Sequence, residues 1–367
     1  MQAATIELLE ELGAADRLIA QGRVLDQLRF TDAGRTLVRV VFDRIASRYR
    51  FALAVPQSTT ERVLAERLAE LGGTVERELE AESVQAVPGG YRVGGHHADG
   101  IPFAVTARFV VGADGAHSMV RSAMGLDFPG ETYQQQFLLA DIALTGRPCA
   151  DNEAVICTSP RGVVVVGRIP NGTYRLVATM PPGARIPQHP DRAQIGRLLT
   201  ERGIDAEPAA DPVWASRFRV HHRAAARFRR GGLLLCGDAA HIHSPAAGQG
   251  MNTGMADAYD LAGRLAAVTS GAADPSVLDG YDQERRAAAT AVLAFTDRMT
   301  RVASLRSAPA RALRNLGLRT LTRIPAARAA ITLQVTGLAR SPLRHRTEQP
   351  LSPTVTRRIA WARSRST

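Results

Sequence analysis

The chain has 367 residues, of which 46 are lysine or arginine and 35 are acidic, and its formal net charge is +11 at neutral pH. The sequence contains no lysine, which excludes a lysine-dependent P-loop, Schiff-base chemistry and pyridoxal phosphate chemistry. A hydrophobic fraction of 45% and a charged fraction of 22% are those of an ordinary globular protein. The length predicts two domains.

The cysteines and the N-terminus set expectations about the compartment. Cys149, Cys157 and Cys236 are odd in number and have no C-x-x-C spacing, which favours a reducing compartment and excludes a thiolate metal cage. The N-terminus carries glutamates where a secretory signal has a basic start. No apolar run approaches the roughly 20 residues that span a bilayer. We expect a cytoplasmic protein without stable membrane insertion.

The excess positive charge lies near the C-terminus. Residues 301–367 contain fourteen arginines against a single acidic residue, Glu348. Such a tail could contact nucleic acid or an anionic membrane. Its leucines equally suit packing against the body of the protein: Leu305, Leu313, Leu316 and Leu321. We expect docked helices with a solvated charged face, and no nucleic-acid partner.

The predicted elements begin with a short helix, because leucine and isoleucine recur at helical spacing up to the first glycine. Strands are expected over 24–30 and 36–41, joined by a turn. Ser58 and Glu61 have the spacing of a capping box, which predicts a helix that begins beyond Ser58 and stops at glycines 72 and 73.

The middle of the chain is rich in strands. Short strands follow from residue 75, and 109–111 is typical of a strand buried on both faces. Between 137 and 180 one strand succeeds another, and Asn171-Gly172 predicts a hairpin turn. We therefore expect an antiparallel sheet in this region.

The last third of the chain begins a new pattern after a helix near 191–202 and a strand near 213–220. Residues 233–236 predict another buried, parallel-type strand, which leads through a glycine-rich loop into a long helix over about 251–268. Beyond it the pattern is helical and is interrupted at prolines 275, 309, 325 and 342.

A first candidate site follows the strand at 109–111. The strand ends in Gly-Ala-Asp-Gly, where glycine permits close approach of the backbone, and a helix begins at once with Ser118 as its expected cap. This order places Asp114 at the carboxyl edge of a sheet, where open α/β sheets bind ligands. A strand-to-helix turn that merely requires Asp and Gly is an equally good interpretation.

A second, longer candidate site follows the strand at 233–236. The strand delivers Asp238 to the sheet edge, where its carboxylate can accept hydrogen bonds from a ribose or a polyol. Gly248 and Gly250 remove side chains from the approach to a helix whose N-terminus carries about half a positive charge. That charge suits an anion, and it would stabilise a reduced isoalloxazine, which gains negative charge at its N1 and C2 carbonyl edge.

Both segments, in this order, resemble the flavin-dependent aromatic hydroxylases related to para-hydroxybenzoate hydroxylase, and the resemblance covers nearly the whole chain. It implies an α/β fold with an incomplete FAD-binding Rossmann-like domain of the glutathione-reductase type, an inserted antiparallel-sheet substrate domain and C-terminal helices. The expected parts are a discontinuous FAD-binding domain (1–20, 54–131 and 221–300), a substrate-binding sheet domain (21–53 and 132–220) and a basic helical tail (301–367).

The resemblance also implies which residues bind the cofactors. Asp238 would bind the ribityl chain of FAD, while the start of the following helix would hold the pyrimidine edge of the ring. Asp114 and Gly115 would serve both FAD and NAD(P)H. The cofactor-binding residues expected in this way are Gln57, Asp114, Gly115, Gly237, Asp238, Pro245, Gly248, Gly250, Met251 and Asn252. No catalytic base is identifiable from the sequence.

The family opens with a strand, G-x-G-x-x-G and a helix, and this sequence shows no such unit. Gly248, Gly250 and Gly254 have a different spacing and follow a loop. We expect that about 30 to 50 residues of the family pattern are missing before Met1. Without them FAD would bind about 10² to 10⁶ times more weakly, and hydrophobic strand edges would be unpaired. Equal bound flavin with and without in-frame upstream codons would contradict this expectation.

These observations predict an FAD-dependent monooxygenase that takes hydride from NAD(P)H and transfers one oxygen atom of O2 to an aromatic or polyketide-like small molecule. The alternative is an N-terminally truncated, catalytically inactive remnant that acts as a binding or interaction module. His241 and His243 lack the acidic or cysteine partners of a metal site. The lack of a G-x-S-x-G elbow argues against a Ser-His-Asp hydrolase.

Overall fold

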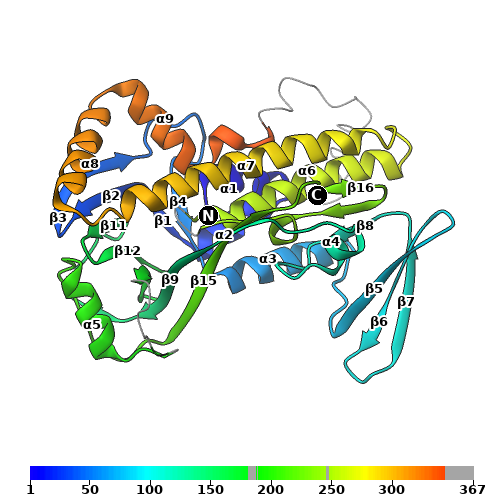
Figure 1. Ribbon diagram of the computed structural model, residues 1–367, viewed down its shortest axis with the longest axis horizontal. Coiled ribbons are helices and arrows are strands. Elements are labelled where there is room, and N and C mark those ends of the chain that lie inside the picture. The colour runs from blue at the N-terminus through cyan, green and yellow to red at the C-terminus, as the bar shows by residue number, and fades with distance from the viewer. Residues whose placement is uncertain (181–186, 188, 245–247, 344–367) are drawn as a thin grey trace.

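The computed structural model describes residues 1–180, 187, 189–244 and 248–343. Two long helices, α6 (Gly250–Thr269) and α7 (Val277–Ala303), run side by side across the molecule (Figure 1). A large sheet lies toward one end, and a three-stranded meander extends from the other. The meander is formed by β5 (Leu79–Val87), β6 (Gly90–His97) and β7 (Pro102–Ala107).

The large sheet has eight strands in the order β18-β15-β9-β13-β12-β11-β2-β3, and only the β11–β2 pair is parallel. The strands are β2 (Gln27–Asp32), β3 (Arg35–Val41), β9 (Gly130–Ile142), β11 (Glu153–Ser159), β12 (Gly162–Arg168), β13 (Tyr174–Met180), β15 (Trp214–Ala224) and β18 (His241–Ile242). The Asn171-Gly172 hairpin is confirmed, because it joins β12 to β13 and Gly172 has a φ of 89°.

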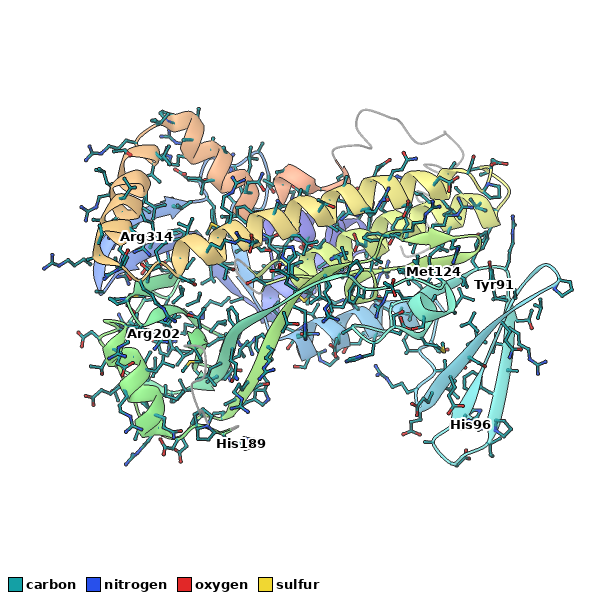
Figure 2. The ribbon with its side chains drawn as sticks, viewed as in Figure 1. Tyr91, His96, Met124, His189, Arg202 and Arg314 are labelled. Carbon is teal, nitrogen blue, oxygen red and sulfur yellow. The ribbon has the colours of Figure 1, made fainter. Side chains whose placement is uncertain are left out.

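Helix α5 (Arg192–Glu201) covers the core of this sheet, and a capping box at Asp191 starts it. Arg202, just past its end, is 2% exposed (Figure 2). Its guanidinium donates hydrogen bonds to the carbonyls of Leu198, Arg161 and Thr179, the last at 2.7 Å. This side chain therefore ties α5 to the edge of the β12–β13 hairpin.

A second sheet pairs the two strands that precede the candidate sites. Its order is β16-β17-β8, with β16 (Arg229–Arg230) antiparallel to β17 (Leu233–Leu235) and β17 parallel to β8 (Val110–Gly112). All three leucines of β17 are buried, as predicted. Val111 of β8 is 41% exposed, so the prediction that this strand is buried on both faces is wrong.

The N-terminal region packs against α6 through α1 (Ala3–Glu11) and forms one core with α2 (Ala15–Gln21) and α3 (Gln57–Glu70). The short strands β1 (Arg23–Leu25) and β4 (Ala52–Ala54) pair beside it. The capping box predicted at Ser58 is wrong. Ser58 lies inside α3, whose cap is Pro56, and no side chain caps the helix.

The remaining elements are short or lie near the C-terminus. They are α4 (Met119–Ala123), β10 (Leu144–Thr145), β14 (Glu207–Pro208), η1 (Gly237–Ala239), α8 (Ala308–Leu321), α9 (Pro325–Val335) and η3 (Leu338–Arg340). The α/β class, the antiparallel sheet and the C-terminal helices agree with the predicted fold class. None of the helices in the described part of the chain has the length and apolar character of a membrane span.

Helix α8 docks on the large sheet through arginines and not through leucines. Asp32, at the end of β2, accepts hydrogen bonds from Arg311 at 2.7 Å, from Arg314 at 2.9 Å and from Asn315 at 2.9 Å. Leu313 and Leu316 are 72% and 60% exposed. The prediction that these leucines pack against the body of the protein is therefore wrong.

Replacing Asp32 with asparagine should weaken this docking, because two buried or half-buried guanidinium groups lose their carboxylate. Burial alone raises the pKa of Asp32, but the hydrogen bonds and charges of Arg311, Arg314 and Asn315 hold it below its ordinary value. We expect a loss of about 1–3 kcal/mol in the free energy of unfolding. In urea titrations the difference from wild type should be full at neutral pH and shrink as the pH falls through the carboxyl range. A constant difference down to acid pH would contradict this account.

Candidate functional site

The two motifs lie side by side because their strands are parallel neighbours. Val110 pairs with Leu233 and Gly112 with Leu235, so both strands end at one sheet edge. Arg121, which is buried, joins the loops that follow the two strands. Its guanidinium donates to the carbonyl of Ala116 at 2.7 Å and to that of Ala239 at 2.9 Å. The predicted juxtaposition of the two motifs is thus present.

Asp114 caps helix α4. Its carboxylate accepts the N–H groups of Met119 at 2.8 Å and Val120 at 3.2 Å, and the hydroxyl of Ser118 accepts that of Arg121. Ser118 caps the helix, as predicted. The observed contacts of Asp114 are those of a residue that stabilises a strand-to-helix turn, which was one of its two interpretations. Gly115, with a φ of 75°, has open space around the position of a side chain.

Asp238 is placed differently from Asp114. It lies in η1, directly beyond β17, and its side chain is exposed. Among the described residues it has neither a hydrogen bond nor an ion pair. Partial burial raises the pKa of Asp238, against an opposing attraction to His241. A carboxylate at a sheet edge without a protein partner is available to a ligand.

Two glycines allow η1 to approach α6 closely. Gly237 has a φ of 60°, and a Cβ atom added to Gly254 would lie 3.4 Å from the Cα atom of Gly237. Gly248, just before α6, has a φ of 61° and open space around it. Among the described residues, Gly248 therefore adds no side-chain bulk just before α6.

Substitutions at Gly254 test this close approach. We expect Gly254→Ala to be tolerated or slightly stabilising, because alanine favours a helix over glycine by about 1 kcal/mol and 3.4 Å is a tight but permissible contact. Gly254→Leu should destabilise by about 1–3 kcal/mol, because the larger side chain overpacks against η1. Urea unfolding of the two variants compares them directly, and equal stabilities would refute the close approach.

A buried charge network links η1 to helices α6 and α7. Asp257 on α6 is 0% exposed and accepts hydrogen bonds from His241 Nε2 at 2.7 Å, from Arg285 Nε at 2.7 Å and from the backbone N–H of Gly237 at 3.3 Å. Although burial raises the pKa of Asp257, the attraction of His241 and Arg285 brings it below its ordinary value. The sequence patterns gave no role to Asp257 or Arg285. The signal that could have identified them is a charged residue at a position that falls on the buried face of a predicted helix.

The rings of His241 and His243 lie parallel, 6.2 Å apart. His243 Nδ1 donates to the carbonyl of Ser244, and burial lowers the pKa of this histidine to about 4, so its ring is neutral at neutral pH. Within the described ranges, no group of three His, Cys, Asp or Glu side chains is placed to hold a metal ion. His241 and His243 instead belong to the support of the loop.

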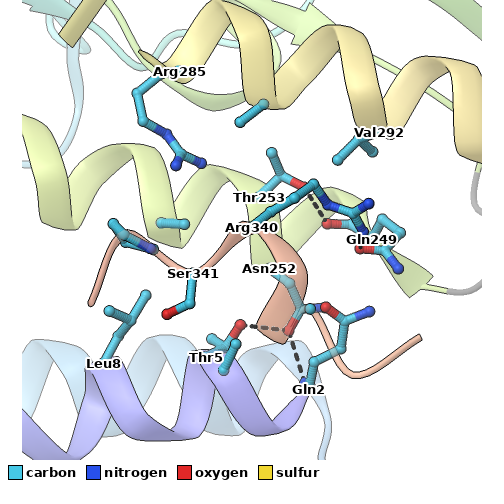
Figure 3. Close-up of a pocket in the computed structure, with 15 residues that line it drawn as sticks. Gln2, Thr5, Leu8, Gln249, Asn252, Thr253, Arg285, Val292, Arg340 and Ser341 are labelled. Carbon is cyan, nitrogen blue, oxygen red and sulfur yellow. Dashed lines mark hydrogen bonds between the residues drawn. The ribbon is translucent and has the colours of Figure 1, made fainter. Parts of the chain in front are cut away.

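Asn252 joins the start of α6 to the start of α1. Its Oδ1 accepts hydrogen bonds from the N–H of Gln2 and the hydroxyl of Thr5, both at 2.8 Å (Figure 3). Its Nδ2 donates to the carbonyl of Gly248 at 2.6 Å. The side chain of Asn252, a buried residue, is thus committed to protein contacts. The cavity at this junction is about 20 Å³, which admits one water molecule and no ring system.

The other predicted site residues are placed as follows. Gln57 begins α3 and donates through its amide to Glu61 at 3.2 Å. Met251 and Gly250 lie in the first turn of α6, where the N–H groups have no intrahelical acceptor. Pro245 lies outside the described residues.

Comparison with known proteins decides the family. A model described as FAD binding domain matches residues 1–296. The chain belongs to this FAD-binding family. The chain is 37% identical to 6-methylpretetramide 4-monooxygenase of Streptomyces rimosus over 86% of its length, and 31% identical to pentachlorophenol 4-monooxygenase of Sphingobium chlorophenolicum over 82%. The resemblance to FAD-dependent aromatic hydroxylases is confirmed.

These matches cover different shares of the proteins compared. The chain spans 56% of the length of each of those two relatives. The solved structure of the anhydrotetracycline hydroxylase OxyS from Streptomyces rimosus superposes with a TM-score of 0.75 at 29% identity, and the match covers 92% of this chain and 67% of that one. The large sheet and the two motif strands of this FAD-binding protein are therefore arranged as in a known hydroxylase.

The described residues fit part of an FAD molecule. The Asp238 carboxylate suits the hydroxyls of a ribityl chain, and the first N–H groups of α6, which have no acceptor within the helix, suit an electron-rich ring edge. Gly248 has open space around the position of a side chain.

Proposed function

We propose that this protein is an FAD-dependent monooxygenase that hydroxylates an aromatic or polyketide-like small molecule with NAD(P)H and O2. The observation that carries the proposal is the Asp238 carboxylate, which has no hydrogen bond or ion pair within the described residues and lies in η1, an element packed against α6. The monooxygenase names of the relatives support the same reaction class. When bound, FAD would supply hydride acceptance and the activation of O2.

In this proposal the cofactor-binding residues have distinct tasks. Asp238 accepts hydrogen bonds from the ribityl hydroxyls, and the backbone N–H groups of Gly250, Met251 and Asn252 hold the ring edge through the helix dipole. Gly248 adds no side chain to the approach, and Gly237 lets η1 lie close to α6. Asp114 and Gly115, at the end of the neighbouring strand, contact FAD and NAD(P)H. Gln57 and Pro245 are the remaining residues that we propose contact the cofactor.

The large sheet would supply the substrate side of the site. Its strand β15 pairs with the edge strand β18, in the register Arg223 with Ile242 and Ala224 with His241. Strand β18 lies between Asp238 and α6 in the chain, so the sheet is joined directly to the cofactor-binding segment. This connection suits a wall that orients the substrate and excludes water. We assign no residue as a general base. In this proposal the rate enhancement therefore comes from the orientation of the substrate and from the cofactor.

Reconstitution of the full chain with FAD tests the proposal. We expect NADPH to bleach the flavin absorbance at about 450 nm without oxygen, and air to restore it. In air, with an anthraquinone or tetracyclic aromatic polyketide present, product heavier by one oxygen atom should form. A chain that binds FAD but neither accepts hydride from NADPH or NADH nor hydroxylates such a compound would overturn the proposal and favour a binding module.

A further inference from the structure

Helix α8 has an inward and an outward face of opposite kinds. The inward face carries Arg311, Arg314 and Asn315, all hydrogen-bonded to Asp32; Arg314 is labelled in Figure 2. Arg314 is 8% exposed, so this face is committed to the body of the protein. The contacts fix the rotation of α8 about its axis and thereby determine which residues face outward.

The outward face is apolar. Leu313 and Leu316 on this face are 72% and 60% exposed. Leu321, in the last turn of α8 and on the same side as Arg314, is 48% exposed, and Ile324 just beyond the helix is 52% exposed. Gly317, beside Leu316, has open space around the position of a side chain. Surface leucines are ordinary when single, but three leucines and one isoleucine exposed within twelve residues of chain indicate an interaction surface.

Arginines lie among these apolar residues in the sequence, and carboxylates are absent from this part of the chain. Arg306, Arg319, Arg323 and Arg328 are exposed. Between residues 298 and 343 the sequence has no Asp or Glu. The apolar stem of an arginine side chain can lie along an apolar surface, while its charged guanidinium group stays at the edge of that surface. The partner of this surface must therefore combine apolar contact with negative charge.

We propose that the outward face of α8, with Leu321, Ile324 and the neighbouring arginines, binds the surface of an anionic lipid membrane. A helix with leucines on one face and arginines at its border lies in the headgroup region, where the leucines enter the acyl boundary and the arginines meet lipid phosphates. A second copy of the chain would bring two arginine-rich surfaces together, and like charges oppose that pairing. A nucleic acid would leave the leucines without apolar contact.

Vesicle co-sedimentation of the full chain tests this inference. We expect binding to vesicles of phosphatidylglycerol and phosphatidylcholine, little binding to pure phosphatidylcholine, and a sharp loss when NaCl rises from about 0.1 M to about 0.5 M. The pair Leu313→Ser and Leu316→Ser should lower the partition coefficient about tenfold or more. The pair Arg319→Gln and Arg323→Gln should lower it about tenfold.

The matched control is Leu71→Ser, which removes a leucine that is 61% exposed at the end of α3. It should bind vesicles as the wild type does, and circular dichroism should show native helix content for every variant. Equal binding to both vesicle types, or undiminished binding by the double leucine variant, would overturn the proposal. If the protein does not bind vesicles, two other results would also overturn the proposal. One is self-association that depends on Leu313 and Leu316, and the other is binding to heparin that does not depend on these leucines.

Discussion

Replacement of Asp257 by asparagine is expected to lower the free energy of unfolding by about 3–5 kcal/mol, as when one partner of a buried ion pair is removed. Arg285, 4% exposed, would keep its charge without a carboxylate, and His241 would lose its charged partner. The N–H of Gly237 would also lose an ionised acceptor. Urea unfolding followed by circular dichroism measures the change.

The matched control for Asp257 is Asp260→Asn, one turn further along α6. Asp260 pairs with Arg264, which keeps Glu284 as a second partner, so the loss should be about 1 kcal/mol or less. Because the pKa of Asp257 is lowered in the fold, its contribution is present above the ordinary carboxyl pKa and is lost as the pH falls through the folded value. Equal losses for the two variants would contradict the role of the buried network.

Replacement of Asp238 by alanine is expected to weaken FAD binding by about 10- to 100-fold, as when one or two hydrogen bonds to a charged acceptor are lost. The carboxylate has no partner in the described part of the chain, so the free energy of unfolding should stay within about 0.5 kcal/mol of wild type. Quenching of flavin fluorescence during titration with protein measures the dissociation constant.

Asp127→Ala provides the control for Asp238, because Asp127 is also an exposed aspartate but lies outside both motifs. Its FAD affinity should equal that of wild type. Because partial burial raises the pKa of Asp238, wild-type affinity should begin to fall above the ordinary carboxyl range as the pH is lowered, and the alanine variant should lose this dependence. Unchanged affinity in Asp238→Ala would remove this carboxylate from the site.

The elements around the site were predictable because short-range patterns determine them. The apolar runs at 110–112 and 233–235 form neighbouring parallel strands, and the Gly-Asp turns after them come together at one edge. The hairpin at Asn171-Gly172 and the long helix α6 follow from turn chemistry and apolar periodicity in the same way. The resemblance to aromatic hydroxylases rested on these same segments.

The features that the sequence did not predict depend on contacts between residues that are far apart in the chain. Periodicity cannot show that Arg285 reaches Asp257 across 28 positions, or that Asn252 bonds to Gln2 across 250. The orientation of α8 was mispredicted because its leucines predicted the buried face, whereas three hydrogen bonds to Asp32 determine it. The domain boundaries and the cytoplasmic location stay predictions.

Hydrogen–deuterium exchange of the full chain with and without FAD tests the central claim, that the Asp238 loop and the start of α6 hold the flavin. We expect FAD to slow amide exchange at 237–239 and 249–252, and the slowing to disappear in Asp238→Ala at the same FAD concentration. If FAD binds yet these amides exchange at unchanged rates while protection appears elsewhere, the flavin site lies in another part of the protein.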